Sequence, residues 1–576
     1  MAMPGSLFSW RIGESDVGIV RDLARAFDLH EALARVVASR GYVDPQEVER
    51  FLKKSVNDLE DPFALEGMEA ACKRLCQAVF AREKILVHGD FDADGITSAA
   101  LLSLFFQELG LEVIPFVPDR LTEGHGISPR AIDLAIRSNV KLVVTCDCGV
   151  SSANEIARLR EAGVETIVTD HHTIPEQLPL AIVVNPKMSH SDLDQAGLSG
   201  VGVAFMLTVG IRSKLREMGY FSNRAEPNLK QYLDIVALGT LADLAPLRGQ
   251  NRILVAHGLE QLQRTLRPGI LAMRESAGLA NASSIHTDDV GFRLAPKINA
   301  AARLGHSFEA LELLLTPERT RANSLAKKLE EWNQERRQLE AWMTRIASLE
   351  AEEQVAKERR AIVVSAAEFH PGVIGLVAQR LVRAYHLPSV VFSTQGEVAK
   401  GSGRSRGDID LVAAFEQCSD LLFGFGGHKE AAGCTIETKR LLEFRQRFEA
   451  AIALQNSLDK GEILIDAELN LGHVDQRFLS DLDRLRPFGM GNREPVFLSK
   501  ARVSGVPREV GKGHVRATLQ GSSGPSYSAI GFGLWESVGR FIKGEVEVAF
   551  TPEENEWQGR REIQLRLHGV RGVRTV

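Results

Sequence analysis

The stretch that decides the fold is His88–Thr97, which has the sequence HGDFDADGIT. The mostly apolar run at 84–87 (KILV) precedes this stretch and predicts a short buried strand, and residues 95–109 (GITSAALLSLFFQEL) predict a helix after it. The histidine and the three aspartates therefore lie on a turn that leaves a strand. In open α/β sheets, ligands bind at this edge.

The three carboxylates of this stretch suggest a metal site. Packed this closely, carboxylates repel each other and lose hydration unless cations neutralise them. Oxygen and imidazole ligands without a thiolate suit Mn²⁺ or Mg²⁺ better than a structural zinc ion. The alternative is an acidic turn that only caps the following helix. Taken alone, this stretch favours the two interpretations equally.

Two further strand ends carry the same kind of residue. Strand-like runs at 140–144 and 164–169 lead to Asp147 and to the triplet DHH at 170–172, and Asp243 follows another apolar segment. Strands that alternate with helices predict a parallel sheet whose carboxyl ends lie at one side. Four separate segments of the chain thus offer metal ligands to one edge.

Composition places the chain among ordinary globular proteins. Its 576 residues are 44% hydrophobic and 25% charged, and this length suggests roughly three to four domains. Because apolar stretches stay below the roughly 18 residues that span a bilayer and the N-terminus lacks a secretory pattern, we expect a cytoplasmic protein without a membrane segment. The net charge of -6 means that nucleic-acid binding requires a local basic surface.

The six cysteines are too sparse for a disulfide framework. Cys146 and Cys148 flank Asp147 and suggest a zinc site as one interpretation. In a strand, however, neighbouring side chains point to opposite faces. We therefore expect both thiols to face into packing, away from Asp147.

Further along the chain, two segments have clear local signals. Thr316-Pro317-Glu318 is typical of a helix start, and residues 319–358 contain neither Gly nor Pro, which predicts one long helix. The motif GSGRSRG at 401–407 combines bare backbone amides, hydroxyls and guanidiniums. That combination suits a phosphate, and a flexible basic turn is the alternative.

The C-terminal part has a different character. From residue 461, short alternating strands separated by turns predict a small antiparallel barrel. Basic residues recur between Arg484 and Arg516, with Phe488 and Phe497 interleaved. A basic surface that carries aromatic rings is a platform for single-stranded nucleic acid, and a solvated charged face over core phenylalanines is the alternative.

In their order along the chain, these motifs resemble those of the DHH phosphoesterase superfamily. The comparable elements are HGDFDADG, the Asp147 strand end, the DHH triplet, GTLADLAPL at 239–247, GSGRSRG, and GFGGHKEAAG at 424–433. In order and length, the chain is most similar to the RecJ family of bacterial single-strand-specific 5′-to-3′ DNA exonucleases. The resemblance extends from about residue 66 to the C-terminus.

The resemblance implies an α/β fold built from several domains. The expected order is a parallel-sheet DHH catalytic domain (66–308), a long connecting helix (309–359), a smaller α/β DHHA1 domain (360–458) and a C-terminal OB-fold-like β-barrel that binds single strands (461–576). Residues 1–65 precede the resemblance and are helix-rich, and we expect them to form an N-terminal helical cap on the next domain.

The resemblance also implies a site for two Mn²⁺ or Mg²⁺ ions. The expected ligands are His88 and Asp92 for one ion, Asp94, His171 and Asp243 for the other, and Asp147 as a bridge between them. Ions held in this way polarise a phosphodiester.

Other residues of this region would act on the substrate. By the same resemblance, His172 would protonate the leaving oxygen or bind phosphate, and Asp170 would orient a liganding histidine. Arg303 would stabilise the charge of the scissile phosphate. His125 stands where the family often has an aromatic residue, so the resemblance implies no role for it.

A second group would hold the end of the DNA. The resemblance implies that Arg120, Ser402 and Arg404 grip a terminal 5′-phosphate, with Ser405 and His428 as further contacts. A pocket for the terminal phosphate would set the polarity of degradation.

The implied activity is metal-dependent removal of 5′-mononucleotides from single-stranded DNA, in recombination, repair and mismatch excision. The expected partners are a single-strand-binding protein and a helicase of the RecQ type, and the expected state is a monomer. One alternative is a phosphodiesterase or phosphatase for short oligonucleotides or cyclic dinucleotides, although such small substrates do not require the long helix and the barrel. Another is a replication scaffold without catalysis, although a scaffold has no reason to keep six metal ligands.

Overall fold

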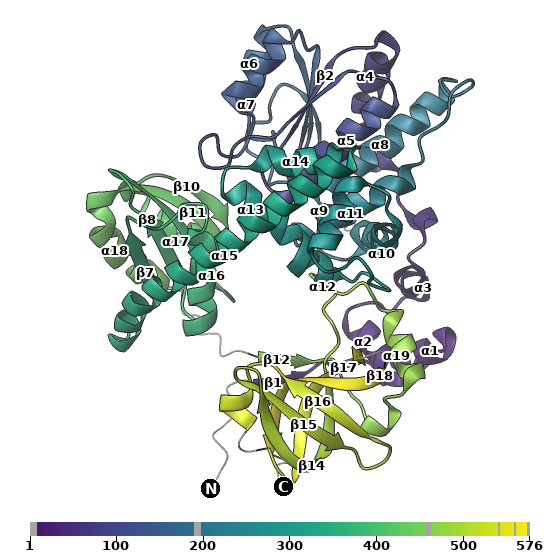
Figure 1. The fold of residues 1–576 in the computed structure, drawn as a ribbon, viewed down its shortest axis with the longest axis vertical. Helices are drawn as coiled ribbons and strands as arrows, with labels where there is room; N and C mark the ends of the chain where they lie inside the picture. Colours follow the sequence, from purple (N-terminus) through teal and green to yellow (C-terminus); the bar gives the residue numbers. More distant parts are fainter. Residues whose placement is uncertain (1–8, 189–196, 456–461, 540–541, 558–559, 573–576) are drawn as a thin grey trace. The chain divides into compact units, whose positions relative to one another are not determined.

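The computed structural model describes residues 9–188, 197–455, 462–539, 542–557 and 560–572 (Figure 1). The chain divides into two compact units. One unit is formed by residues 59–459, and the other combines residues 1–58 with residues 460–576. Each unit has its own hydrophobic core. In the described part of the chain, none of the helices has the length and apolar character of a membrane span.

The larger unit contains the predicted parallel sheet. Its strand order is β3 (Val113–Phe116), β2 (Ile85–Gly89), β4 (Leu142–Cys146), β5 (Glu165–Thr169) and β6 (Ile182–Val184), with all neighbours parallel. Alternate residues of β2 enter two different cores: Ile85 and Val87 face one cluster, and Leu86 faces the other. Helices therefore cover both faces of the sheet, which confirms the predicted α/β class.

The helices on the two faces follow from this alternation. The first cluster includes residues of α4 (Met68–Ala81), α5 (Ala93–Glu108) and α8 (Gly200–Glu217). The second includes residues of α6 (Pro129–Arg137) and α7 (Ala153–Glu161). Cys146 and Cys148 are buried free thiols, as expected.

Helix α5 begins earlier than the sequence predicted. Asp92 is its N-cap, and the Asp92 side chain accepts hydrogen bonds from the amides of Asp94 and Gly95. A Cβ on Gly95 would lie 2.4 Å from the nitrogen of Asp90, so only glycine permits this tight turn. The acidic turn thus does cap the helix. The cap holds the Asp92 side chain beside the backbone of Asp94.

A long helix, α15 (Arg319–Ala356), connects two parts of the larger unit (Figure 1). Its first half contributes Leu325 and Leu329 to the core of the parallel sheet, and its second half contributes Met343 to another cluster. The helix begins at Arg319 and not at the predicted Pro317, because the hydroxyl of Thr316 accepts the amide of Glu318 outside the helix.

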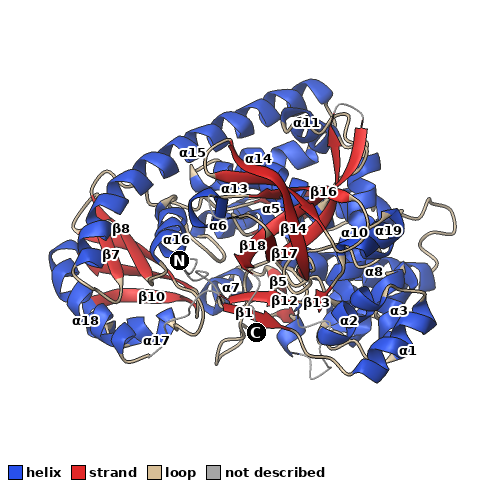
Figure 2. Ribbon diagram, turned by 90° about the horizontal axis from the view of Figure 1, so that it is seen from below, coloured by secondary structure: helices blue, strands red, loops and turns tan. Residues whose placement is uncertain are grey.

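The second part of the larger unit is a mixed five-stranded sheet. Its order is β10 (Leu422–His428), β11 (Ala431–Glu437), β9 (Val398–Arg404), β8 (Ser389–Ser393) and β7 (Ile362–Ala366), and only the pair β7–β8 is parallel. Helix α16 (Ile374–Tyr385) covers one face, and α17 (Leu411–Glu416) and α18 (Leu441–Ala453) cover the other (Figure 2).

The smaller unit contains a closed barrel. Its strands are β14 (Phe497–Val510), β15 (His514–Gln520), β16 (Ser526–Gly531), β18 (Arg560–Gly572) and β17 (Glu545–Trp557). The pairing of β14 with β17 closes the barrel. This five-stranded barrel confirms the predicted OB-like architecture.

The expected cap on the catalytic domain is wrong. Helices α1 (Val17–Phe27), α2 (Glu31–Ser39) and α3 (Pro45–Lys53) share the core of the barrel unit. The first described strand belongs to the same unit, because β1 (Ser9–Ile12) pairs with β12 (Glu462–Ile465). The buried Arg40 extends this contact by bonding to Asn492 and pairing with Asp466 at 3.5 Å. The apolar faces of the helices are therefore buried against the C-terminal part of the chain.

A candidate metal and phosphate site

Ligand-type side chains from several segments converge at the carboxyl ends of the central strands. They follow β2, β4 and β5 and end α9 (Leu233–Ala242). Their ligand atoms form three overlapping groups, and within each group all atoms lie within 4.8 Å of one another. The groups are Asp90, Asp92 and Asp147; Asp147, His171 and His172; and Asp94, His171 and Asp243. We call their union the acidic cluster.

Asp147 is shared by two of the groups, as a bridging residue must be. Its φ of 63° lies in the left-handed region, which is rare outside glycine and is often found at functional sites. Its amide donates to the carbonyl of Thr169 at 2.9 Å, and this bond fixes the turn after β4. Its Oδ1 lies 3.0 Å from His171 Nε2. The backbone therefore aims this buried carboxylate into the cluster.

Asp94 is held by the start of α8. Its two oxygens accept the amides of Gly200 at 2.7 Å and of Val201 at 2.9 Å. The N-terminus of a helix offers free amides and a positive dipole end, which stabilise a carboxylate there. A Cβ on Gly200 would come within 2.6 Å of Asp147 Oδ1, so the helix approaches this closely only with glycine.

The electrostatics of the acidic cluster call for a cation. Burial raises the pKa of Asp94 to about 7, and Asp92 adds to this rise. Burial also raises the pKa of Asp243 to about 9, with Asp94 and Asp92 adding to it. The buried Oδ1 of Asp90 has no hydrogen-bond partner in the described part of the chain. Oxygen and imidazole donors in this number fit Mn²⁺ or Mg²⁺.

His88 does not join these groups, although it was expected to be a ligand. Its ring is fully buried against Phe116, with centroids 5.1 Å apart. Its Nε2 accepts the amide of Ser128 at 3.5 Å, and its Nδ1 lies 3.6 Å from Cys148 Sγ. Burial lowers the pKa of His88 to about 4. Its place near Asp92 is taken by Asp90.

Asp90 is the residue that the sequence interpretation missed. It is 3% exposed and pairs through Oδ2 with His125 Nδ1 at 3.2 Å. This hydrogen bond raises the pKa of His125 to about 9. The sequence did contain a signal for it. The DFDAD run at 90–94 has three carboxylates, and the expected ligand set used only Asp92 and Asp94, which left Asp90 without a role.

Asp170 orients His172, and not a histidine of the expected ligand set. Its Oδ1 lies 2.8 Å from His172 Nδ1, and it also accepts the amides of His171 and His172. Although burial opposes the effect, the hydrogen bond and charge of His172 lower the pKa of Asp170 to about 2. The ring of His171 is instead oriented by the carbonyl of Leu198, 3.1 Å from Nδ1.

A second site in the same unit is basic. A pocket of about 450 Å³ brings together Arg120, Arg303, Ser402 and Arg404, as expected for a phosphate site. Burial lowers the pKa of Arg303 to about 9, and the charges of Arg120 and Arg404 add to the effect. Three guanidiniums crowded in this way require an anion. We call this the arginine pocket.

The start of α16 also lines the arginine pocket. Gly372, Ile374 and Gly375 are part of its wall, and α16 has no side-chain N-cap. A Cβ on Gly375 would meet Ser402 Oγ at 2.9 Å and a guanidinium nitrogen of Arg404 at 3.0 Å. Free helix amides beside arginines form a strong anion site. The sequence gave no sign that the start of this helix faces Arg404.

Two expected phosphate contacts lie elsewhere. The hydroxyl of Ser405 is buried and donates to the carbonyls of Ile409 and Lys429, so it holds a turn. His428 ends the exposed strand β10 and is not among the residues that line the arginine pocket. Ser405 directly follows Arg404, the last residue of β9, and successive side chains along a strand point to opposite faces.

The arginine pocket lies next to the acidic cluster. Arg120 stacks on Phe91, with its guanidinium carbon 4.8 Å from the ring centroid, and Phe91 sits between Asp90 and Asp92. The charges of Asp92 and Asp90 raise the pKa of Arg120 against the larger lowering by burial. Two sites of opposite charge thus adjoin within one unit. Such a pair is complementary to a chain of phosphates bound with cations.

Comparison with known proteins gives matches along the whole chain. Models of the DHH family N-terminal domain, the DHHA1 domain and the RecJ OB domain match residues 84–240, 359–454 and 465–569. The single-stranded-DNA-specific exonuclease RecJ of Dickeya dadantii is 37% identical, over 92% of this chain and 94% of that protein. The protein of the same name from Escherichia coli is 36% identical, over 94% and 96%.

A solved structure has the same architecture. The crystal structure of RecJ in complex with Mn²⁺ from Thermus thermophilus has a TM-score of 0.84 and 31% identity, over 99% of this chain and 80% of that chain. Its similarity covers both units of the fold.

Metal-free protein is expected to lose stability as the pH rises from about 7 to about 9. The raised pKa of Asp243, about 9, means that the folded state holds a proton that the unfolded state has lost, so folding is favoured at the lower pH. His125, with its pKa of about 9, has the same sign. Mg²⁺ would replace the proton of Asp243 and should raise Tm most at about pH 9.

Differential scanning fluorimetry with chelator and with Mg²⁺ checks this expectation. The Asp243→Asn variant, which cannot titrate at this position, serves as the control and should show a flatter pH dependence. A Tm of the metal-free protein that rises between these two pH values would contradict the expectation.

Proposed function

Because the chain belongs to the RecJ family, we propose that it is a metal-dependent exonuclease that degrades single-stranded DNA from the 5′ end to 5′-mononucleotides. The observation that carries the proposal is the arginine pocket beside the acidic cluster. One site suits a terminal phosphate and the other suits cations on the next phosphodiester. A strand anchored at its end would be cut one nucleotide inward.

The arginine pocket supplies the polarity of the reaction. A terminal 5′-phosphate carries more charge than an internal phosphodiester, and Arg120, Ser402 and Arg404 offer it guanidiniums and a hydroxyl. The amides at the start of α16 add donors. A 3′ end presents a hydroxyl instead and gains little from this pocket.

The acidic cluster supplies the reacting centre. Asp92, Asp94, Asp147, His171 and Asp243, together with Asp90, would hold two Mn²⁺ or Mg²⁺ ions. When bound, such ions polarise the scissile phosphate and lower the pKa of a water molecule. The Thermus thermophilus relative was solved with Mn²⁺, which supports this assignment.

The bond changes follow from this arrangement. Water attacks the phosphorus between the first and second nucleotides in line with the 3′-oxygen of the first. The bond between phosphorus and that oxygen breaks, and the second nucleotide keeps the phosphate as a new 5′-phosphate. Arg303, which lines the pocket and donates to the carbonyl of Gly372 at 3.1 Å, would balance charge on the phosphate.

His172 is placed to deliver the proton to the leaving oxygen. Its Nδ1 is occupied by Asp170 Oδ1 at 2.8 Å, which fixes the ring and leaves Nε2 for the substrate. The ring is partly exposed and contacts the rings of His125 and His171. Asp170 would therefore position the proton donor, a role that resembles the orienting carboxylate of other acid–base pairs.

The barrel would bind the strand that trails from the active site. Arg502, Arg508, Lys512 and Arg516 are exposed on β14, β15 and the turn between them. Arg508 stands directly opposite Arg516 in the β14–β15 pairing. Like charges in this position destabilise a sheet unless an anion lies over them. Phe532, 57% exposed at the end of β16, offers a ring for base stacking.

Other basic residues of this segment have structural roles. Phe488 and Phe497 are buried in the core, so the expected stacking on them is wrong. Arg484 donates to the carbonyls of Phe27 and Asp28, and Arg493 pairs with Asp466 at 3.1 Å. Arg484 thus connects α1 to the C-terminal part of the chain, whereas the pair of Arg493 and Asp466 lies within that part.

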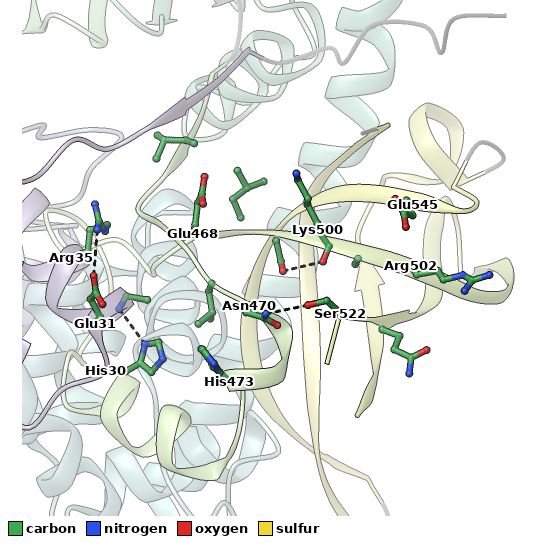
Figure 3. Close-up of a pocket in the computed structure, with 18 residues that line it drawn as sticks. His30, Glu31, Arg35, Glu468, Asn470, His473, Lys500, Arg502, Ser522 and Glu545 are labelled. Atoms are coloured by element: carbon green, nitrogen blue, oxygen red, sulfur yellow. Dashed lines mark hydrogen bonds and ion pairs between the residues drawn. The ribbon is translucent and has the colours of Figure 1, made fainter. Parts of the chain in front are cut away.

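A large groove in the barrel unit is a poorer candidate for DNA. It has a volume of about 1130 Å³ and lies between α2 and the first half of β14 (Figure 3). Its wall carries Glu31, Glu468 and Glu545 beside Arg35, Lys500 and Arg502. This balance of charge does not select for a polyanion.

The central experiment is a time course on single-stranded DNA labelled at either end. We expect release of mononucleotides from the 5′ end, dependence on Mn²⁺ or Mg²⁺, and little cleavage of blunt duplex DNA. Asp147→Asn should reduce the rate by several orders of magnitude, because it removes the shared carboxylate. Asp133→Asn, an exposed residue of α6, is the matched control.

The outcomes separate the alternative functions. Cleavage confined to a dinucleotide would favour a small-substrate phosphodiesterase. Metal binding without cleavage of any of these nucleic acids would favour a scaffold. Unchanged turnover by folded Asp147→Asn would refute the two-metal assignment.

The arginine pocket predicts a preference for a 5′-phosphorylated end. Arg404→Ala should reduce kcat/KM on 5′-phosphorylated DNA by about 10–100-fold, because charged hydrogen bonds are lost, while a 5′-hydroxyl substrate changes little. Arg406→Ala, two residues along and outside the pocket wall, is the control. An Arg404→Ala enzyme that keeps the preference would move the phosphate site elsewhere.

The barrel surface predicts a change in salt dependence. Replacing Arg508 and Arg516 with Ser should weaken binding of long single strands and reduce the slope of log affinity against log salt by about 1.4, or about 0.7 for each lost phosphate contact. Fluorescence anisotropy measures this slope. Arg21→Ser with Arg25→Ser on α1 removes the same charge as a control. Equal slopes in the two double variants would argue against this surface.

The partners are inferred from the family resemblance. A single-strand-binding protein would supply coated substrate, and a helicase of the RecQ type would supply unwound ends. Together they would place the enzyme in recombination, repair and mismatch excision. We infer a monomeric, cytoplasmic enzyme.

A further inference from the structure

The loop between β3 and α6 places a histidine against the acidic cluster. His125 lies between Gly124 and Gly126, whose φ values of 76° and 95° are left-handed, so the loop turns sharply on both sides of it. The amide of Ile127 donates to Ser152 Oγ at 3.3 Å, which fixes the end of the loop. His125 is therefore held in place by the backbone around it.

The ring of His125 has contacts on two sides. Its Nδ1 lies 3.2 Å from Asp90 Oδ2. Its edge meets the ring of His172, with centroids 5.0 Å apart, and the ring of Phe91 lies 6.5 Å away. These contacts fix the ring plane as well as the position of Nδ1.

As a result, the two carboxylate oxygens of Asp90 have different surroundings. Oδ2 is engaged by His125, and Oδ1 is buried without a hydrogen-bond partner in the described part of the chain. Asp90 offers a ligand atom within 4.8 Å of those of Asp92 and Asp147. A free oxygen in a buried group of carboxylates is suited to a cation.

Two other carboxylates of the acidic cluster are positioned by backbone amides of helix starts. Asp94 is fixed by two amides of α8, and Asp92 is fixed by two amides of α5. Asp90 accepts the backbone amide of Phe91 and, unlike Asp92 and Asp94, also has a side-chain partner from a distant loop. In a metal site, contacts of this kind, made by residues that are not themselves ligands, fix the orientation of the ligands.

We propose that His125 is a positioning residue that holds Asp90 in the orientation required to bind a divalent cation together with Asp92 and Asp147. The inference rests on the proposed function, since it takes these carboxylates as metal ligands. It assigns His125 no contact with DNA. The alternative is that its exposed side, 45% of the side chain, touches the substrate directly.

The test measures binding of Mn²⁺ to metal-free protein by calorimetry, without DNA. His125→Phe keeps an aromatic ring beside His172 and Phe91 but loses the hydrogen bond, and should weaken Mn²⁺ binding by about 10–100-fold. His125→Asn places an amide nitrogen near the position of Nδ1 and should restore most of the affinity. His428→Phe, an exposed histidine outside the cluster, is the matched control.

Kinetics provide the second readout. With His125→Phe, raised Mn²⁺ should bring kcat back towards the unmodified value, and KM for DNA should stay unchanged. Unchanged Mn²⁺ affinity in His125→Phe would overturn the inference, and a raised KM for DNA with unchanged Mn²⁺ affinity would overturn it in favour of direct contact. If the unmodified protein itself binds no Mn²⁺, the proposed function fails as well.

Discussion

Mutual repulsion among buried carboxylates is the constraint on which the rest of this structure depends. Strand ends, the start of α5 and the end of α9 bring acids to one place, where burial removes the water that would screen them. The fold offsets part of this cost with backbone amides, as at Asp94 between Gly200 and Val201. The remainder requires cations, so the stability of the site and its chemistry have one electrostatic origin.

The arginine pocket beside the acidic cluster is under the same constraint, with positive charges in place of negative ones. Arg120, Arg303 and Arg404 repel one another in the arginine pocket, where helix amides also point. A phosphate chain carrying divalent cations relieves both sites at once. In the proposed function, a preference for one end of a strand would come from the placement of these two charge clusters, without recognition of any base.

Much of this arrangement was predictable from sequence, because apolar runs fix strands and parallel strands collect their ends on one edge. The pattern could not decide between His88 and Asp90, since neighbouring residues on a turn point in directions that depend on dihedral angles. It also left open whether Phe497 lies on the surface or in the core, where the structure buries it. The partner of α1–α3 was missed because an amphipathic helix specifies an apolar face and not the segment that covers it.

The barrel unit combines segments that lie about 400 residues apart in the sequence, which has a consequence for synthesis. Arg40 bonds to Asn492, 452 residues later, and β1 pairs with β12. The N-terminal helices thus leave the ribosome long before the segment that completes their core, while the intervening catalytic unit can already fold. Nascent chains would complete the unit that carries the acidic cluster before the barrel unit, so a prematurely terminated product would contain the candidate metal site without the barrel.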